Sequence, residues 1–430
     1  MLEKLFKLQE HQANVRTEIV AGLTTFLTMS YIIFVNPDIL SSTGMDRDAV
    51  FVATCLAAAI GTLIMTFVAN WPIAMAPGMG LNAFFAFTVV AQMGYSWQQA
   101  LGAVFISGVV FVILTVTGIR AWLIAGIPSS LRSAIAAGIG LFLGIIALGT
   151  AGVVVANPAT KVGLGDLTSV TTLYAILGFF IIAALDALKI RGAILIGILA
   201  ITILSILTGQ TEFHGIFSAP PSIAPTFMQF DIMGALHTGF FHVILVFVLV
   251  EVFDATGTMI GVATRAGLIQ PGKPNRLGRA LFADSTAIVA GSFLGTSSTT
   301  AYIESASGVQ AGGRTGLTAL VVAILFLLAL FLSPLASVVP GYATAPALLY
   351  VAGLMLRELV DVDWEDITEA VPAAIAAIAM PLTYSIANGL AFGFISYVAI
   401  KALTGRFRDI HPATLLVAVL FIIKYAFFPG

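Results

Sequence analysis

Apolar runs separated by short polar stretches follow one another along almost the whole chain. Many of these runs approach the ~20 residues that an α-helix needs to cross a bilayer. A transmembrane β-barrel would need alternating apolar and polar residues, and segments such as ALVVAILFLLALFL (319–332) show no such alternation. The pattern therefore predicts an all-α polytopic membrane protein with about fourteen spans. The predicted spans are 19–36, 49–69, 73–91, 99–118, 132–150, 171–188, 192–208, 237–261, 280–294, 298–311, 315–333, 342–357, 368–385 and 387–403.

A long polar segment, 209–236, separates the seventh predicted span from the eighth and divides the spans into two halves of seven. Because seven is odd, the second half is inverted relative to the first, and inverted repeats recur in secondary transporters. A further apolar stretch, 412–428, follows the last predicted span. We expect it to lie at the membrane interface or to pack against the helix bundle.

The third predicted span of each half is interrupted. In the first half it reads NWPIAMAPGMGLNAFFAF (70–87), where Pro72, Pro77 and Gly78 oppose a continuous helix. In the second half it begins GTSSTTAYIES (295–305), which is rich in small hydroxyl residues. Non-helical backbone at membrane depth is tolerated only where it lines a cavity or is buried in protein. Two matching breaks predict a substrate site near the middle of the bilayer, whereas close packing of helices through small residues is the alternative.

Apart from Asp186 and Glu369 at span ends, four acids fall inside predicted spans, in a chain that is only 9% charged, against about 25% in soluble domains. Glu251 and Asp254 share one face of the eighth span, Asp284 lies in the ninth and Glu304 in the tenth. No Lys or Arg of these spans is expected to neutralise them. A buried carboxyl can hold a proton or accept hydrogen bonds from a ligand, and a proton-coupled carrier needs both properties. The alternative for each acid is a structural hydrogen bond to a neighbouring helix.

The basic residues predict the orientation of the chain. With a cytoplasmic N-terminus the outer loops receive Arg47 and Lys161, and nearly all other basic residues, Arg120 among them, fall in inner loops. The net charge of −2 gives no reason to expect nucleic acid, and the single cysteine, Cys55, excludes an intrachain disulfide. No catalytic, metal-binding or nucleotide-binding motif is visible, so we expect neither an enzyme nor a metal or cofactor.

The interrupted and acidic segments resemble those of a known family. The motifs APGMGLNAFFAF, VFDATGT, GTSSTTAYIES and GGRTGLTA are similar, in this order, to the AzgA-like branch of the nucleobase:cation symporters, which are purine permeases for hypoxanthine, guanine or adenine. The resemblance covers nearly the whole chain, including TTFLTMSYIIFVNP (24–37) and SPLASVVPGYATAPAL (333–348). It implies the fold of the related uracil permease, in which the third and tenth spans contain short strands that pair antiparallel.

The resemblance also implies a division into domains and a homodimer formed through the gate domains. The implied parts are a cytoplasmic N-terminus (1–18), a core domain of spans 1–4 and 8–11 (19–118 and 237–333), and a gate domain of spans 5–7 and 12–14 (119–236 and 334–430).

The site residues that the resemblance implies surround the two breaks. For the eighth span the branch motif favours Asp254, whereas alignment with the uracil permease brings Glu251 closer. The expected substrate-binding residues are Glu304, Asp254, Asn82, Tyr302, Thr300, Gly80 and Phe84. The expected proton-coupling residues are Asp254, Glu304, Glu251 and Asp284.

The sequence thus predicts a multi-pass protein of the cell membrane that imports a purine nucleobase by proton symport, with the core moving against the gate to alternate access. A related fold serves anion transporters and exchangers, which are the alternative. Against that alternative, a site built from carboxylates without Lys or Arg would repel an anion.

Overall fold

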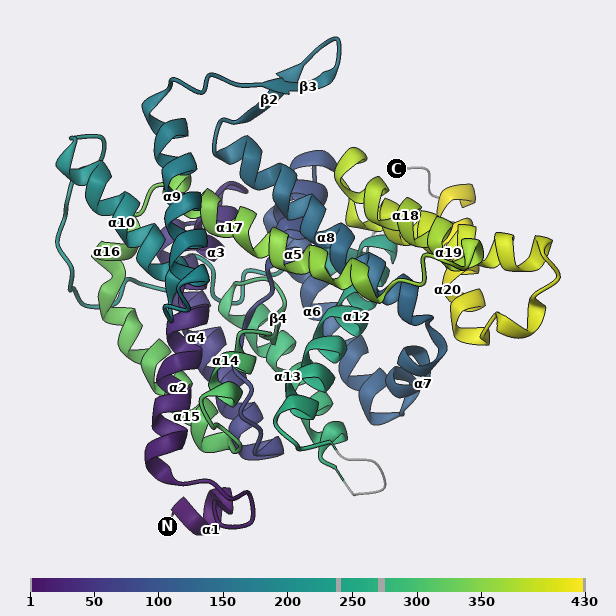
Figure 1. Ribbon diagram of the computed structural model, residues 1–430, viewed down its shortest axis with the longest axis horizontal. Coiled ribbons are helices and arrows are strands. Elements are labelled where there is room, and N and C mark those ends of the chain that lie inside the picture. Colours follow the sequence, from purple (N-terminus) through teal and green to yellow (C-terminus); the bar gives the residue numbers. More distant parts are fainter. Residues whose placement is uncertain (1, 237–240, 270–274, 428–430) are drawn as a thin grey trace.

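The computed structural model describes residues 2–236, 241–269 and 275–427, without the side chains at 241, 242 and 253. Helices dominate, and Figure 1 shows them gathered around strand β4 near the middle of the molecule. The elements of the first half are α1 (Leu2–Phe6), α2 (Val15–Met29), α3 (Ile32–Ser41), α4 (Arg47–Ile64), the π-helix η1 (Met65–Ala69), β1 (Met75–Pro77), α5 (Met79–Ala83), the π-helix η2 (Phe84–Gln92), α6 (Trp97–Val116), α7 (Ile119–Gly126), α8 (Ser129–Thr150), β2 (Val154–Asn157), β3 (Lys161–Leu164), α9 (Val170–Ala187) and α10 (Ala193–Leu207).

The second half follows a long connection with little regular structure, which contains the short helix α11 (Ile232–Leu236). Its remaining elements are α12 (Phe241–Arg265), α13 (Leu277–Leu294), β4 (Thr299–Ala301), α14 (Ser305–Gln310), α15 (Gly316–Ala329), the 3₁₀-helix η3 (Leu330–Leu332), α16 (Ser333–Val338), α17 (Gly341–Met355), the 3₁₀-helix η4 (Leu356–Asp361), α18 (Ile367–Leu382), α19 (Ile386–Leu403), the 3₁₀-helix η5 (Phe407–Asp409) and α20 (Pro412–Phe427).

Ten helices of the described residues are long and apolar enough to cross a membrane, and four shorter apolar helices accompany them. Three of the shorter ones, Met79–Gln92, Ala193–Leu207 and Ile367–Leu382, coincide with the predicted third, seventh and thirteenth spans. The predicted tenth span is strand β4 followed by α14. The prediction of an all-α polytopic fold with interrupted third and tenth spans is therefore confirmed.

The two interrupted spans meet in a two-stranded sheet. Strands β1 and β4 pair antiparallel, with Ala76 opposite Thr300, and every residue of both strands is buried. Each break exposes backbone groups that neighbouring segments must satisfy. The N–H of Met75 donates to Thr62 Oγ1 on α4 at 2.9 Å, and the N–H of Gly78 donates to the carbonyl of Ser298 at 2.8 Å. The sheet therefore ties the two halves of the chain together through main-chain hydrogen bonds.

Two groups of helices flank this sheet. In one group α13 packs against α4 and α6, and α15 packs against α2 and α4. In the other group α8 packs against α17 and α18, α18 against α19, and α9 against α10 and α17. The division of these helices into a core domain and a gate domain stays a prediction.

The last apolar stretch forms α20, which packs against α19 and α7. Its residues Val417, Ala418 and Phe421 are buried, so one face of this helix belongs to the bundle. Of the two placements expected for residues 412–428, the structure shows packing against the bundle.

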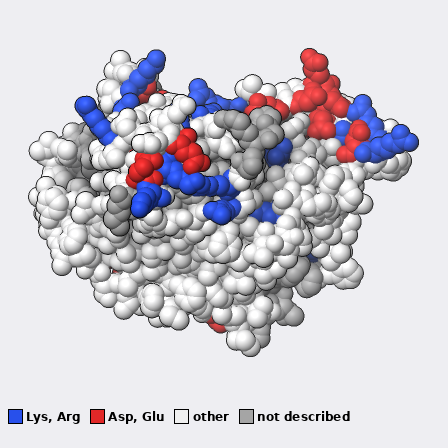
Figure 2. All heavy atoms as spheres, turned by 90° about the horizontal axis from the view of Figure 1, so that it is seen from below, with Lys and Arg blue, Asp and Glu red and all other residues white. Residues whose placement is uncertain are grey.

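On the face that Figure 2 shows, Lys, Arg, Asp and Glu gather along one side and most of the remaining surface is uncharged. Large apolar side chains such as Val116, Phe180 and Ile203 point outward and are more than half exposed. An uncharged surface with outward apolar side chains suits contact with lipid rather than water.

Candidate substrate site

The four acids predicted from the sequence lie together beside the sheet. Glu251 on α12 and Asp284 on α13 are fully buried, whereas Asp254 and Glu304 are partly exposed. Asp254 lies within electrostatic range of Asp284 and Glu304, and Glu251 lies within range of Asp254 and Asp284. Two helices and the tenth-span segment thus bring four carboxyl groups into one region.

Glu251 and Asn82 contact adjacent serines of the tenth-span break. Ser298 Oγ donates to Glu251 Oε1, and Ser297 Oγ donates to Asn82 Oδ1. The second polar atom of each side chain, Glu251 Oε2 and Asn82 Nδ2, is buried without a hydrogen-bond partner among the described residues. Buried polar atoms without partners are rare and costly. This pair presents one acceptor and one donor next to the sheet, as a site for a polar ligand would.

Asp284 is neutralised by a basic residue from outside the spans that carry the acids, which the sequence did not reveal. Arg120 Nη2 lies 2.9 Å from Asp284 Oδ2, and both side chains are buried. The sequence predicts Arg120 in an inner loop, because it follows the fourth apolar run. The chain instead turns at Gly118, which has a positive φ of 77°, and begins α7 with Arg120 pointing into the bundle.

The other predicted site residues hold the breaks in position. Tyr302 donates from its hydroxyl to the carbonyl of Pro77 at 2.6 Å, and Thr300 Oγ1 donates to Asp284 Oδ1 at 3.2 Å. Phe84 is fully buried and packs edge-to-face on Phe247, with ring centroids 5.0 Å apart.

Gly80 lies where the helix after the first break meets α8. A Cβ added there would come within 2.6 Å of Ile139 Cγ2. A side chain at this position would force α8 away from the break, so the close approach of the two elements requires glycine.

Glu304 has a partner that sequence reasoning missed. Tyr31, at the junction of α2 and α3, donates from its hydroxyl to Glu304 Oε1 at 2.6 Å. Asn36 on α3 was also missed, and it donates to Thr54 Oγ1 and to Thr296 Oγ1 at 2.7 and 2.9 Å. A polar residue within a long apolar run was the only local signal for either residue.

One face of α12 leads from the acids towards the end of that helix. Gly257 and Gly261 follow Asp254 on this face, and a Cβ added to either would meet no described atom within 4 Å. Ile303, next to Glu304, is 51% exposed although it adjoins the buried strand β4. This face of α12 is therefore not covered by other described residues beyond Asp254.

The opposite end is closed by contacts between the two helix groups. Thr344 on α17 donates from its hydroxyl to Asp38 Oδ2 on α3 at 2.8 Å. Thr88 in η2 donates to the carbonyl of Tyr384 at 3.3 Å, and the Tyr384 ring packs against Phe87 and Phe142. These contacts join the two helix groups at this end of the molecule.

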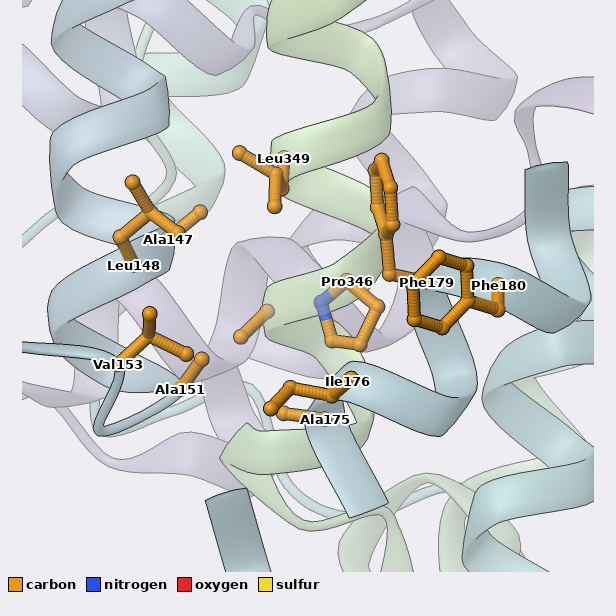
Figure 3. Close-up of a pocket in the computed structure, with 11 residues that line it drawn as sticks. Ala147, Leu148, Ala151, Val153, Ala175, Ile176, Phe179, Phe180, Pro346 and Leu349 are labelled. Carbon is orange, nitrogen blue, oxygen red and sulfur yellow. The ribbon is translucent and has the colours of Figure 1, made fainter. Parts of the chain in front are cut away.

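A separate apolar cavity lies away from the acids, between α8, α9 and α17 (Figure 3). It has a volume of about 150 Å³ and is lined by side chains such as Leu148, Phe179, Pro346 and Leu349. None of its lining residues is charged, and the cavity is apolar, so it is poorly suited to bind a polar ligand. The described residues also contain no group of three His, Cys, Asp or Glu side chains that could hold a metal ion.

The fold and the buried acids define a membrane transport protein rather than an enzyme. Two solved structures share the fold at low sequence identity. The transmembrane domain of the cyanobacterial bicarbonate transporter BicA has a TM-score of 0.65 at 15% identity, covering 88% of this chain and 97% of that chain. The overall structure of SLC26A9 also has a TM-score of 0.65, at 12% identity, covering 95% of this chain and 68% of that one.

The sequence comparisons give the family. The sequence profile of the permease family that includes xanthine and uracil permeases matches residues 16–392, and the chain belongs to this family of nucleobase:cation symporters. Adenine permease AdeP of Escherichia coli (strain K12) is 54% identical over 99% of this chain and 96% of that protein. Guanine/hypoxanthine permease PbuO of Bacillus subtilis (strain 168) is 46% identical over 98% of this chain and 99% of that protein. Nucleobase transporter PlAzg2 of Paenibacillus larvae is 34% identical over 89% of this chain and 76% of that protein.

Proposed function

We propose that this protein imports a purine nucleobase across the cell membrane by proton symport, with adenine the first candidate before hypoxanthine and guanine. The observation that carries the proposal is the donor and acceptor pair at the sheet, Asn82 Nδ2 and Glu251 Oε2. A purine has ring and exocyclic N–H groups next to ring nitrogens, so it can satisfy both atoms at once. The names of the relatives support the same substrate class, and the higher identity to an adenine permease favours adenine.

The anion transporters of the same fold give the rival proposal, but the site argues against it. Four carboxyl groups surround the breaks, and the single Arg among them is already paired with Asp284. An anion entering here would meet uncompensated negative charge in a poorly solvated region. A neutral base with N–H donors would instead find acceptors.

In this proposal some acids bind the substrate and another exchanges the coupled proton. Glu251 contacts the tenth-span break and accepts from an N–H group of the purine, while Glu304, held by Tyr31, supplies a second acceptor. Asp254 is partly exposed on the open face of α12 and exchanges the coupled proton. This assignment reconciles the two candidates for the eighth span, because Glu251 and Asp254 lie on the same helix face three residues apart.

Alternating access follows from the contacts that close one end of the molecule. With a cytoplasmic N-terminus, the closed end with Asp38 and Thr344 faces outward and the open face of α12 faces the cytoplasm. Breaking the Asp38–Thr344 and Thr88–Tyr384 hydrogen bonds would let the core move against the gate and open the site outward. The orientation of the N-terminus and the homodimer through the gate domains stay predictions.

The test is uptake of labelled adenine, hypoxanthine and guanine into cells that express the chain, with and without a protonophore. We expect one purine to be taken up preferentially and the protonophore to abolish its accumulation. Labelled bicarbonate and sulfate serve as the anion arm of the same assay. Uptake of an anion without uptake of any purine by a well-expressed protein would overturn the proposal.

A further inference from the structure

Arg120 is a buried cation next to the proposed site. Its Nη2 donates to Asp284 Oδ2 at 2.9 Å and to Thr256 Oγ1 at 3.1 Å, and its Nη1 donates to the carbonyl of Leu281 at 3.0 Å. The guanidinium carbon lies 4.0 Å from the centre of the Phe111 ring. Burying a guanidinium is costly unless its charge and its N–H groups find partners. Elements α6, α12 and α13 each supply one or more of those partners.

The contact continues from Arg120 to the substrate site through Asp284. One carboxylate oxygen of Asp284 accepts from Arg120, and the other accepts from Thr300 Oγ1 at 3.2 Å. Thr300 is the central residue of strand β4 and lies opposite Ala76 of strand β1. Asp284 also lies within electrostatic range of Glu251, the acid that contacts Ser298 of the break. A single line of polar contacts therefore joins α7 to the two strands.

We propose that Arg120 is a positioning residue of the transport site. Through Asp284 it holds strand β4 in register, and it keeps Asp284 as a permanent partner rather than as an exchangeable acid. Glu251 and Asp254 are then the groups left to respond to substrate and proton. The inference rests on the proposed function and corrects one part of it, because it removes Asp284 from the predicted proton-coupling residues.

The charges around Asp284 predict the direction in which each substitution should displace the pH dependence. Besides Arg120, the charged groups within electrostatic range of Asp284 are Glu251 and Asp254 from α12. Glu304 and Tyr302 from the tenth-span segment lie within range of Asp254. The Arg120–Asp284 pair contributes no net charge to this group. Removing Arg120 leaves an extra negative or newly titrating group, and removing Asp284 leaves an extra positive charge.

The experiment compares Arg120→Gln, Asp284→Asn and the double variant for binding of labelled adenine to the purified protein and for uptake, across a range of pH. We expect the pH at which adenine uptake is half-maximal to be about one unit higher in R120Q than in the wild type. In D284N this pH should be lower than in the wild type by a similar amount. The double variant should return the midpoint to near the wild-type value. R120Q should also weaken binding at least tenfold, because strand β4 loses its support.

Two further variants keep the test informative if a single replacement fails to fold. Arg120→Lys keeps the charge but cannot reproduce the fork of contacts, so it should hold the wild-type midpoint with weaker binding. Arg279→Gln, at an exposed position of the same helix as Asp284, should behave as the wild type.

The inference would be overturned if the pH of half-maximal uptake were unchanged in both single variants. It would also be overturned if this pH in the double variant were no closer to the wild-type value than in the single variants. A wild-type protein that binds no purine would count against the proposed function instead. In that case the melting temperature of the purified variants can be measured against pH, because melting does not depend on a substrate. The pH dependence of melting should then be displaced upward in R120Q and downward in D284N.

Discussion

The break in the third span and the break in the tenth span join in one sheet, but the helices around them differ in chemistry. In the first half, α3 and α4 provide neutral groups, with Asn36 donating to Thr54 and Thr62 accepting from strand β1. In the second half, α12 and α13 provide Glu251, Asp254 and Asp284. The two halves thus repeat a backbone design, while the acids beside the sheet all come from the second half. We infer that the second half performs the proton coupling, and that the first half supplies Asn82 for binding and Arg120 as a counter-charge and otherwise shapes the site.

The largest expected effect comes from the second half. Glu251→Gln should lower purine uptake by about 100-fold or more, because it removes the buried acceptor beside the break and leaves an amide donor in its place. Uptake of labelled adenine, normalised to protein in the membrane, measures this. Glu10→Gln, an exposed acid paired with Lys7, is the matched control and should keep full uptake. Near-normal uptake in E251Q would return Glu251 to a structural role.

A methyl group at Gly80 should have the next largest effect. The added Cβ would meet Ile139 Cγ2 at 2.6 Å, so Gly80→Ala should press the first break against α8 and slow transport by about tenfold. The maximal rate of uptake should fall more than the apparent affinity. The double variant Gly80→Ala, Ile139→Ala should recover much of the rate, and a double variant slower than G80A would contradict a steric cause.

Loss of a neutral side chain should affect stability more than transport. Asn36→Ala removes two buried hydrogen bonds, to Thr54 and Thr296, and should cost about 2–3 kcal/mol of stability. Thermal melting of the purified protein would show this as a lower transition temperature. Uptake per folded molecule should change by less than about threefold. A loss of uptake as large as that of E251Q, with unchanged melting, would show that Asn36 of the first half also takes part in binding or coupling.

The smallest effect is expected at an acid outside both regions. Hydrogen bonds from the backbone and hydroxyl of Thr368, and then from Arg406, lower the pKa of Asp366 from 3.8 to about 2. A carboxyl with a lowered pKa stabilises the folded state above its unfolded value, and this contribution is lost as the pH falls from about 4 towards 2. Asp366→Asn should therefore make melting less dependent on pH between about 4 and 2.

The same variant should leave the pH profile of uptake between pH 5 and 8 unchanged, because Asp366 is ionised throughout that range. A displaced uptake profile in D366N would show that proton coupling is not confined to the acids at the sheet.

Much of the fold could be predicted because its causes are local. Apolar runs of bilayer length specify the spans, and Pro72, Pro77 and Gly78 prevent a helix where strand β1 forms. The acids could be recognised one by one, since an ionisable residue within an apolar run needs a reason. The pairing of the strands and the choice of substrate class, in contrast, came from resemblance to a family rather than from these patterns.

The partners of the acids could not be predicted in this way. Arg120 follows an apolar run and reads as an ordinary basic residue of an inner loop, yet it pairs with Asp284, 164 residues later in the sequence. Tyr31 reads as part of the first span, yet it binds Glu304 across 273 residues. A local sequence pattern does not predict which distant segments will lie side by side.

The sequence by itself determined which apolar runs form the spans, where two spans are interrupted and which acids fall within spans, because these properties depend on neighbouring residues. Only the tertiary structure decided how deeply each acid is buried, which acid has a fixed counter-charge and which polar atoms lack partners. Those properties depend on distances between elements, and these are set when the two inverted halves pack around strands β1 and β4.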